Sequence, residues 1–296
     1  MVRDTASFTR MPESEIELDQ PLAAPVAAAA SSQTKSSLRL AIDDILEGIR
    51  SSDIWLMLGW LEVKQRYRRS VLGPFWLTIS TGLIISAMGP LYGRLFGQQI
   101  GNYFAYLAVS FVIWQLISQV ITDACNAFIN AESFIKQVRL PITVYILRVV
   151  WRNLIIFFHN FIIVVLVLAY FRPPLNWHLL LFPVALLVFL INAVWVSLVL
   201  GLVCARFRDI PLIVTNLVLV AFFMTPIMWR PEMLGRYIWA VNLNPFYHFL
   251  EIIRQPLLGG PVNLVSWVAV AGITVAGFAA MLALFSRFRA RIAYWV

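Results

Sequence analysis

Very few side chains in this 296-residue sequence stand where they could do acid–base chemistry. Such catalysis needs a carboxylate or a histidine held close to the reacting group, usually beside a second titratable residue. The chain has 15 acidic residues, yet none lies between Glu62 and Asp123, and none between Glu132 and Asp209. Only Asp123 is near a long apolar stretch, and we interpret it as a solvated acid at a helix end. The sequence therefore predicts no catalytic residues.

The histidines and cysteines predict no metal site. Only His248 has an acid one helical turn away, Glu251, and we interpret this pair as hydrogen bonding at an interface. Cys125 and Cys204 stand in no CxxC or His-rich context, so we interpret them as small apolar packing residues.

A phosphate-binding loop is also missing from the sequence. The pattern GxxxxGK[ST] requires a Gly-Lys dipeptide, and the chain contains none. If the protein works against a gradient, its energy must come from a separate subunit. A passive channel would lack the loop in the same way, so both alternatives stay open here.

The composition indicates a chain that folds in lipid. Charged residues make up 13% of the sequence, where about 25% is usual, and hydrophobic residues make up 60%. A soluble core cannot absorb that much apolar surface. The net charge of +8 comes from basic clusters between apolar runs, a pattern that orients membrane proteins and does not require nucleic acid as a partner.

Charge-free intervals predict six transmembrane helices. Each interval is continuously apolar and holds the ~20 helical residues that cross ~30 Å of hydrocarbon, without the alternation of barrel strands. The six intervals are 70–93, 95–122, 153–171, 179–205, 210–229 and 255–286.

The basic residues near the span ends predict which side each loop occupies. Thirteen lie on one side and five on the other, so the positive-inside rule places the first set in the cytosol, together with both termini. The cytosolic set is Lys64, Arg66, Arg68, Arg69, Lys136, Arg139, Arg148, Arg152, Arg206, Arg208, Arg287, Arg289 and Arg291, and the outer set is Arg94, Arg172, Arg230, Arg236 and Arg254.

Three further segments flank these spans. Residues 1–36, rich in Ala, Ser, Pro and Glu, are expected to form a disordered cytosolic tail, followed by amphipathic helices over 37–69 and the transmembrane domain over 70–296. Residues 53–69 predict an amphipathic helix in the membrane interface, either an anchor or a receiver of force from a cytosolic partner. Its basic end, a candidate contact for phosphate headgroups, contains Lys64, Arg66, Tyr67, Arg68 and Arg69.

The cytosolic loop 126–141 predicts a short amphipathic helix that ends at Pro141. Such a helix suits a groove on another protein, and the plain alternative is a helix that lies on lipid. Its candidate docking residues are Asn130, Glu132, Phe134, Ile135 and Lys136.

The outer segment 230–262 is too polar to span the membrane and too apolar for an ordinary loop. Its prolines divide it into two helix-sized pieces, 232–243 and 246–257, which we expect to be re-entrant at a pore mouth. Aromatic residues at span ends and mid-span are either packing residues or surfaces on which a sugar ring can stack. The candidate channel residues are Trp76, Trp114, Trp195, Trp229, Phe246 and Tyr247.

Residues 64–76, KQRYRRSVLGPFW, resemble the K-x-RY-[KR]-x-S-x-LG-x-x-W signature of ABC-2 type permeases that export polysaccharides, O-antigens or polyol phosphates. The resemblance covers 54–296, but residues 77–81 lack a proline that many members carry after the tryptophan. Further matches are Asn130-Ala131, Pro141, the Arg206-x-Arg208-Asp209 turn, 225–229, Asn244-Pro245-Phe246, Arg254 and 291–295.

The resemblance implies a homodimer with a continuous channel in the bacterial inner membrane. Two copies of a separate ATPase, which would bind the ATP and magnesium, would dock on the 126–139 loop, and 53–69 would be the interface helix. The substrate would be a lipid-linked glycan, whether O-antigen, capsule or teichoic acid. The alternatives are an ABC-2 exporter of a drug or small lipid, and a membrane-embedded glycosyl- or acyltransferase, which the few acids disfavour.

Overall fold

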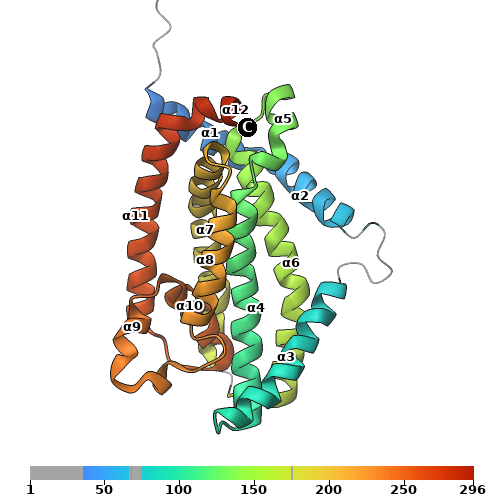
Figure 1. Ribbon diagram of the computed structural model, residues 1–296, viewed down its shortest axis with the longest axis vertical. Helices are drawn as coiled ribbons and strands as arrows, with labels where there is room; N and C mark the ends of the chain where they lie inside the picture. The colour runs from blue at the N-terminus through green and yellow to red at the C-terminus, as the bar shows by residue number, and fades with distance from the viewer. Residues whose placement is uncertain (1–35, 67, 69–74, 175) are drawn as a thin grey trace, which may run out of the picture. The chain divides into compact units, whose positions relative to one another are not determined.

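The computed structural model describes residues 36–66, 68, 75–174 and 176–296, and a compact unit runs from Ser37 to Val296. Residues 1–35 of the predicted tail lie outside the described residues, and so do Tyr67 and Arg69 of the predicted basic cluster. The described part of the chain is helical and contains no strand (Figure 1). Its α-helices are α1 Ser37–Arg50, α2 Ser52–Arg66, α3 Phe75–Leu95, α4 Ile100–Cys125, α5 Glu132–Gln137, α6 Ile142–Phe171, α7 Leu181–Arg206, α8 Ile210–Met224, α9 Ile238–Asn242, α10 Pro245–Leu258, α11 Leu264–Phe288 and α12 Ile292–Trp295.

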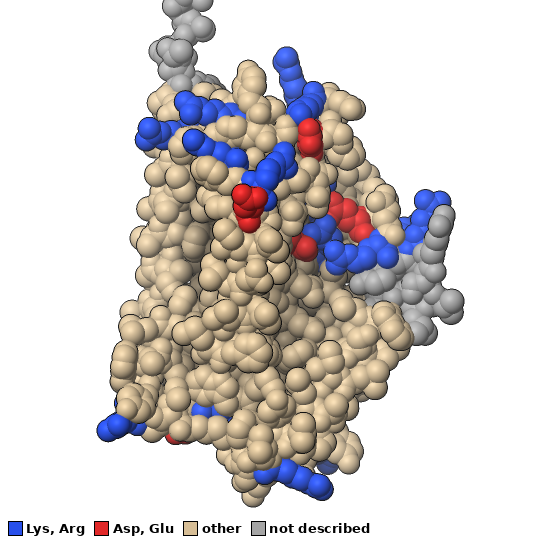
Figure 2. Space-filling view, in the orientation of Figure 1, with Lys and Arg blue, Asp and Glu red and all other residues tan. Residues whose placement is uncertain are grey.

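Five helical segments among the described residues are long and apolar enough to cross a membrane. They are Phe75–Leu95, Ile100–Cys125, Ile142–Phe171, Trp177–Arg206 and Leu264–Trp295. The face in Figure 2 shows the corresponding surface pattern, with Lys, Arg, Asp and Glu gathered at the end that carries α1, α5 and α12 and a broad uncharged region below it. That end is the predicted cytosolic end.

The predicted span 210–229 has a different construction from the other five. Its helix, α8, has 15 residues, or about 22 Å, and stops at Met224. Thr225 takes an extended conformation because it precedes Pro226, which disfavours helical geometry in the residue before it. The following non-helical backbone has its carbonyls satisfied by side chains: Tyr103 donates to Met228 O at 2.5 Å, and Tyr106 to Pro226 O at 2.9 Å. Such pairing is what permits irregular backbone at membrane depth.

The charge-free interval 255–286 begins before the last span does, whereas the predicted helical piece 246–257 matches α10. Residues 255–258 belong to α10, which ends at Gly259 in the left-handed conformation (φ 69°), and α11 begins only at Leu264. Gly259 adopts this conformation at no steric cost and so ends α10. Hydropathy gives no sign of this end, because the sequence stays apolar into the next helix. α10 packs against α4, α7 and α11 and is largely buried, as the predicted re-entrant segment requires.

α4 is the central helix of the unit. It contacts α3, α6, α7, α8 and α10, and two-thirds of its apolar window is buried. Polar side chains reinforce this packing at mid-helix, where Gln115 of α4 bonds Thr81 of α3 at 3.1 Å and accepts from Asn160 of α6 at 2.9 Å. Hydrogen bonds between helices are worth about 0.6–2 kcal/mol each in lipid.

α1 is fastened across the predicted cytosolic end by one buried acid, Asp44. Its carboxylate accepts from the backbone N–H of Ile142 at 3.2 Å and of Thr143 at 3.1 Å, and it pairs with Arg289 at 2.8 Å. The first N–H groups of a helix have no partner within that helix, so Asp44 caps α6 from outside. One side chain thus joins α1, α6 and the end of α11.

Candidate functional site

The candidate site is built on α2, which lies close against α6. The close approach is possible because residue 59 is a glycine. A Cβ atom at Gly59 would come within 2.7 Å of the Trp151 ring and 3.1 Å of the Arg148 carbonyl oxygen. Trp55 adds an edge-to-face contact with Trp151, with ring centroids 6.2 Å apart. The helix predicted over 53–69 is therefore observed as Ser52–Arg66, with its contact side fixed on α6, and its place in the membrane interface stays a prediction.

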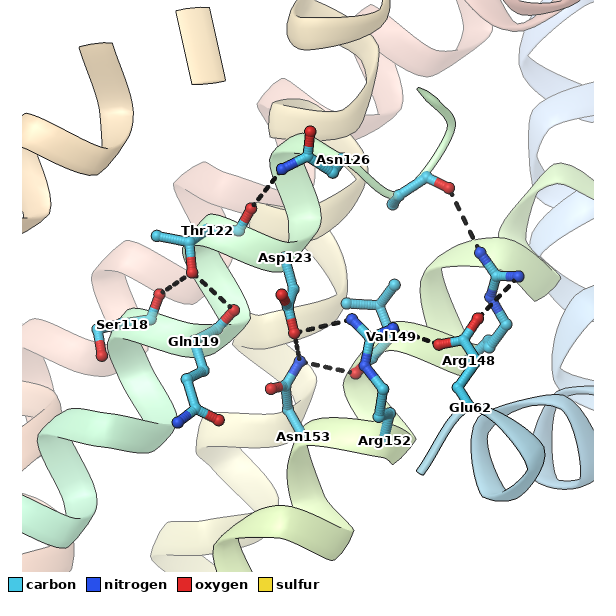
Figure 3. Close-up of polar contacts among 11 residues, drawn as sticks. Glu62, Ser118, Gln119, Thr122, Asp123, Asn126, Arg148, Val149, Arg152 and Asn153 are labelled. Atoms are coloured by element: carbon cyan, nitrogen blue, oxygen red, sulfur yellow. Dashed lines mark hydrogen bonds and ion pairs between the residues drawn. The ribbon is translucent and has the colours of Figure 1, made fainter. Parts of the chain in front are cut away.

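One helical turn after Gly59, Glu62 begins a charge cluster that joins α2, α4 and α6 (Figure 3). Glu62 binds Arg148 at 3.0 Å and also pairs with Arg152. Arg152 reaches on to Asp123 of α4 at 2.8 Å, and Asn153 donates to the same carboxylate oxygen at 3.0 Å. We define these five residues as the charge cluster.

The charge cluster corrects the interpretation of Asp123 as a merely solvated acid. Asp123 and Glu62 are each about one quarter exposed, whereas the Arg148 side chain is only 6% exposed. Buried guanidinium groups are costly unless carboxylates and hydrogen bonds compensate them. Sequence analysis missed the cluster, although one signal was available: these charges flank apolar spans, where unpaired charges are expensive.

A cavity of about 420 Å³ opens beside the charge cluster. Besides cluster residues, the cavity is lined by Arg66 of α2 and by Asn126 and Asn130 of the loop that follows α4. The cavity therefore lies between the interface helix and the loop that was predicted to dock a partner.

The loop itself is anchored by one aromatic residue and exposes another. Phe128 is fully buried against Gly201 of α7, while Phe134 on α5 is 48% exposed. Among the other predicted docking residues, Ile135 is half-buried and Asn130, Glu132 and Lys136 are exposed. Lys136 bonds Glu132 at 2.6 Å and lowers the pKa of that carboxyl below its ordinary value, so Glu132 stays ionised at neutral pH.

The described part of the predicted headgroup cluster is exposed. Lys64, Arg66 and Arg68 all lie on the surface at the end of α2. No described carboxylate pairs with Lys64 or Arg68.

The candidate channel residues fall into two groups. Trp114 is buried within the protomer, against Phe222 and Phe246, and Trp195 packs on α11, where a Cβ at Gly277 would lie 2.2 Å from its ring. These two make packing contacts in the single chain. Tyr247 is buried, Phe246 and Trp229 are half-buried, and Trp76 is 58% exposed. Their part in a channel stays a prediction.

At the opposite end, which is predicted to be the outer one, α10 carries a second buried ion pair, Arg254 with Glu251. Arg254 also donates to Ser110 Oγ at 3.1 Å and to Pro226 O at 2.8 Å, and its guanidinium lies 4.4 Å from the centre of the Tyr106 ring. The predicted His248–Glu251 pair does not form. His248 instead contacts Ser266 Oγ at 3.0 Å and Asn242 O at 2.8 Å.

Together these features define a multi-pass helical membrane protein with a charged end that is predicted to be cytosolic, an exposed loop helix and a buried polar helix at the opposite end. The profile of the ABC-2 type transporter family matches residues 54–258, which is more than half of the chain, and the chain belongs to this family. The match confirms the resemblance found in the sequence and the all-helical membrane fold. It leaves the exact number of crossings a prediction.

Three relatives are named O-antigen export system permease protein RfbA. The one from Myxococcus xanthus is 31% identical over 169 residues, 57% of this chain and 65% of that relative, so the match spans just under two-thirds of its length. Two from Klebsiella pneumoniae are 24% identical over 248 residues, 81% of this chain and 94% of the relative, and 25% identical over 216 residues, 71% and 82%.

Proposed function

We propose that this chain is the membrane-spanning subunit of an exporter that moves a lipid-linked polysaccharide of the O-antigen type across the bacterial inner membrane. The observation that carries the proposal is its similarity to permeases named for O-antigen export, which in one case extends over 81% of the chain. The shortage of acids in the spans agrees with this function, because a proton-coupled carrier ordinarily needs carboxylates at mid-membrane.

The power source in this proposal is a separate ATPase, which binds ATP and magnesium and docks on α5. Three features support α5 as the docking element. It lies at the cytosolic end, Phe134 is exposed there, and Phe128 holds the base of the loop in the bundle. A partner's motion at α5 would reach α2, α4 and α6 through the charge cluster.

The Phe134→Asp variant should lose its complex with the ATPase. Replacing an anchoring aromatic by a charge removes apolar contact and places a carboxylate in the interface, an effect of at least 2 kcal/mol or roughly 30-fold in affinity. Co-purification of the two subunits from membranes measures it. Trp239→Asp is the matched control, because Trp239 is 59% exposed at the outer end and should not affect the complex. A full yield of complex with Phe134→Asp would contradict docking on α5.

A second copy of the chain completes the proposed channel. α8 supports this homodimer because none of its 15 residues is buried within the single chain. Trp76 is likewise exposed and free to face a passing sugar ring, whereas Trp114 and Trp195 would act by supporting the wall. Lys64, Arg66 and Arg68 are proposed to meet the phosphate of the lipid carrier, since ammonium and guanidinium groups both bind phosphate.

Complementation tests the proposed function. A bacterium that lacks its own O-antigen permease should regain surface polysaccharide when this chain is expressed with its ATPase, and not when either is expressed alone. Labelling of surface glycan on intact cells gives the readout, and immunoblots establish that the protein is in the membrane. Surface glycan that stays absent although both subunits are folded and associated would refute the substrate class.

A further inference from the structure

The outer end of the chain contains a cavity of about 330 Å³ that lies away from the charge cluster and from α5. The start of α4, the end of α6, residues 230–232 and α10 enclose it. Cavities of 300–1,000 Å³ are typical of small-molecule sites.

The floor of the cavity is rigid because its polar groups bind each other. Arg254 is 1% exposed and is held by Glu251, Ser110 and the Pro226 carbonyl. The second carboxylate oxygen of Glu251 accepts from Gln255 at 2.6 Å. These groups shape the cavity but have most of their hydrogen-bonding capacity already occupied.

The mouth of the cavity has unoccupied donors and acceptors. Arg230 contacts the Tyr106 ring at 5.2 Å, but within the described residues its guanidinium donates no hydrogen bond, and its Nε is buried. Glu232 is exposed and has no ion-pair partner within the part of the chain described. Tyr247 is buried, and its hydroxyl has no hydrogen-bond partner among the described residues.

The charges of the cavity favour an uncharged ligand. Two arginines, Arg230 and Arg254, stand against two glutamates, Glu232 and Glu251, and the inner pair is mutually neutralised. At the mouth, the Arg230 guanidinium remains as a donor and the Glu232 carboxylate as an acceptor, and the Tyr247 hydroxyl lines the same cavity. Sugar hydroxyls both donate and accept, so this set matches them better than it matches a phosphate, which has only oxygens to offer to a positive site.

Apolar faces complete the match to a sugar. The Phe171 and Tyr247 rings and Pro173 line the same cavity, and the C–H face of a pyranose packs well against rings of this kind. We propose that this outer cavity binds a neutral sugar residue of the exported chain, with Glu232 and Arg230 contacting its hydroxyls. The source of the sugar rests on the proposed function, and the binding chemistry rests on the cavity alone.

Saturation-transfer NMR on the full-length protein in detergent tests the proposal. The probes are free glucose, galactose, mannose, rhamnose and N-acetylglucosamine at millimolar concentrations, which detect weak sites. At least one sugar should receive saturation from the protein, and Glu232→Gln and Tyr247→Phe should each weaken its binding by about 5- to 20-fold. Arg236→Gln is the matched control, since Arg236 is exposed on the same outer segment but does not line the cavity.

Each outcome decides a separate question. No transfer to any of the five sugars, or equal transfer in Glu232→Gln and the original protein, overturns the site. Displacement of a bound sugar by inorganic phosphate overturns its preference for a neutral ligand. Absent binding together with restored surface polysaccharide in cells refutes the cavity and leaves the export function standing, whereas binding without export refutes the function and leaves the cavity.

Discussion

Replacing Arg254 by Met should lower the free energy of unfolding by about 3–5 kcal/mol, which is the usual cost of removing one partner from a buried ion pair. Glu251 would keep only Gln255, while Ser110 Oγ and the Pro226 carbonyl would lose a charged donor. Equilibrium unfolding in detergent micelles measures the loss. Because Arg254 also donates to the Pro226 carbonyl, digestion by protease should begin near residues 225–229.

A second substitution distinguishes a buried unpaired charge from simple loss of volume. In the Glu251→Gln/Arg254→Met double variant no charge remains unpaired, so most of the lost stability should return. Arg236→Met serves as the control, because Arg236 is exposed and, among the described residues, contacts only the neighbouring Tyr237, whose hydroxyl accepts from it at 2.6 Å. A double variant as unstable as Arg254→Met would show that the ion pair is not the cause.

The Glu62→Gln variant should separate ATP hydrolysis from export. Arg148 would lose its carboxylate and α2 its charged contact with α6, which we expect to cost about 2–3 kcal/mol, less than for a fully buried pair because Glu62 is partly exposed. In proteoliposomes that contain this chain and the proposed ATPase, export should fall at least 10-fold while hydrolysis falls much less. The α5 surface is unchanged in this variant, so the ATPase should still bind.

Glu47→Gln is the matched control for this experiment. It makes the same chemical change on α1, outside the charge cluster and the docking loop, where Glu47 is exposed and forms no ion pair within the described residues. Equal small losses of stability and export in both variants would mean that the charge cluster is a surface feature without a role in transmission.

Hydropathy located most of the spans because burial in lipid leaves a continuous signal in the sequence. It failed where a helix ended without any fall in hydropathy. α8 stops at Thr225 because of Pro226, and α10 stops at Gly259 because of a left-handed turn. Both breaks depend on backbone geometry, which an average over apolar residues does not register.

The ion pairs of the charge cluster could not be predicted because their partners are distant in the sequence. Glu62 pairs with Arg152 across 90 positions, and Asp123 meets Arg152 across 29. Counting basic residues assigned Arg148 and Arg254 to loop sides, and so treated them as topological signals. Only the packing of α2 and α10 against other helices shows that these arginines are structural cations inside the protein.

The position of Arg254 along the chain has a consequence for biosynthesis. Its observed contacts, to Tyr106, Ser110, Pro226 and Glu251, all lie earlier in the sequence than Arg254 itself. A ribosome therefore releases every group that compensates this cation before the cation emerges. When the helices insert in order from N- to C-terminus, Arg254 enters the bilayer after the segments that contain its partners. In a rearranged gene that encoded α10 first, only Glu251 would be present to compensate the charge of Arg254.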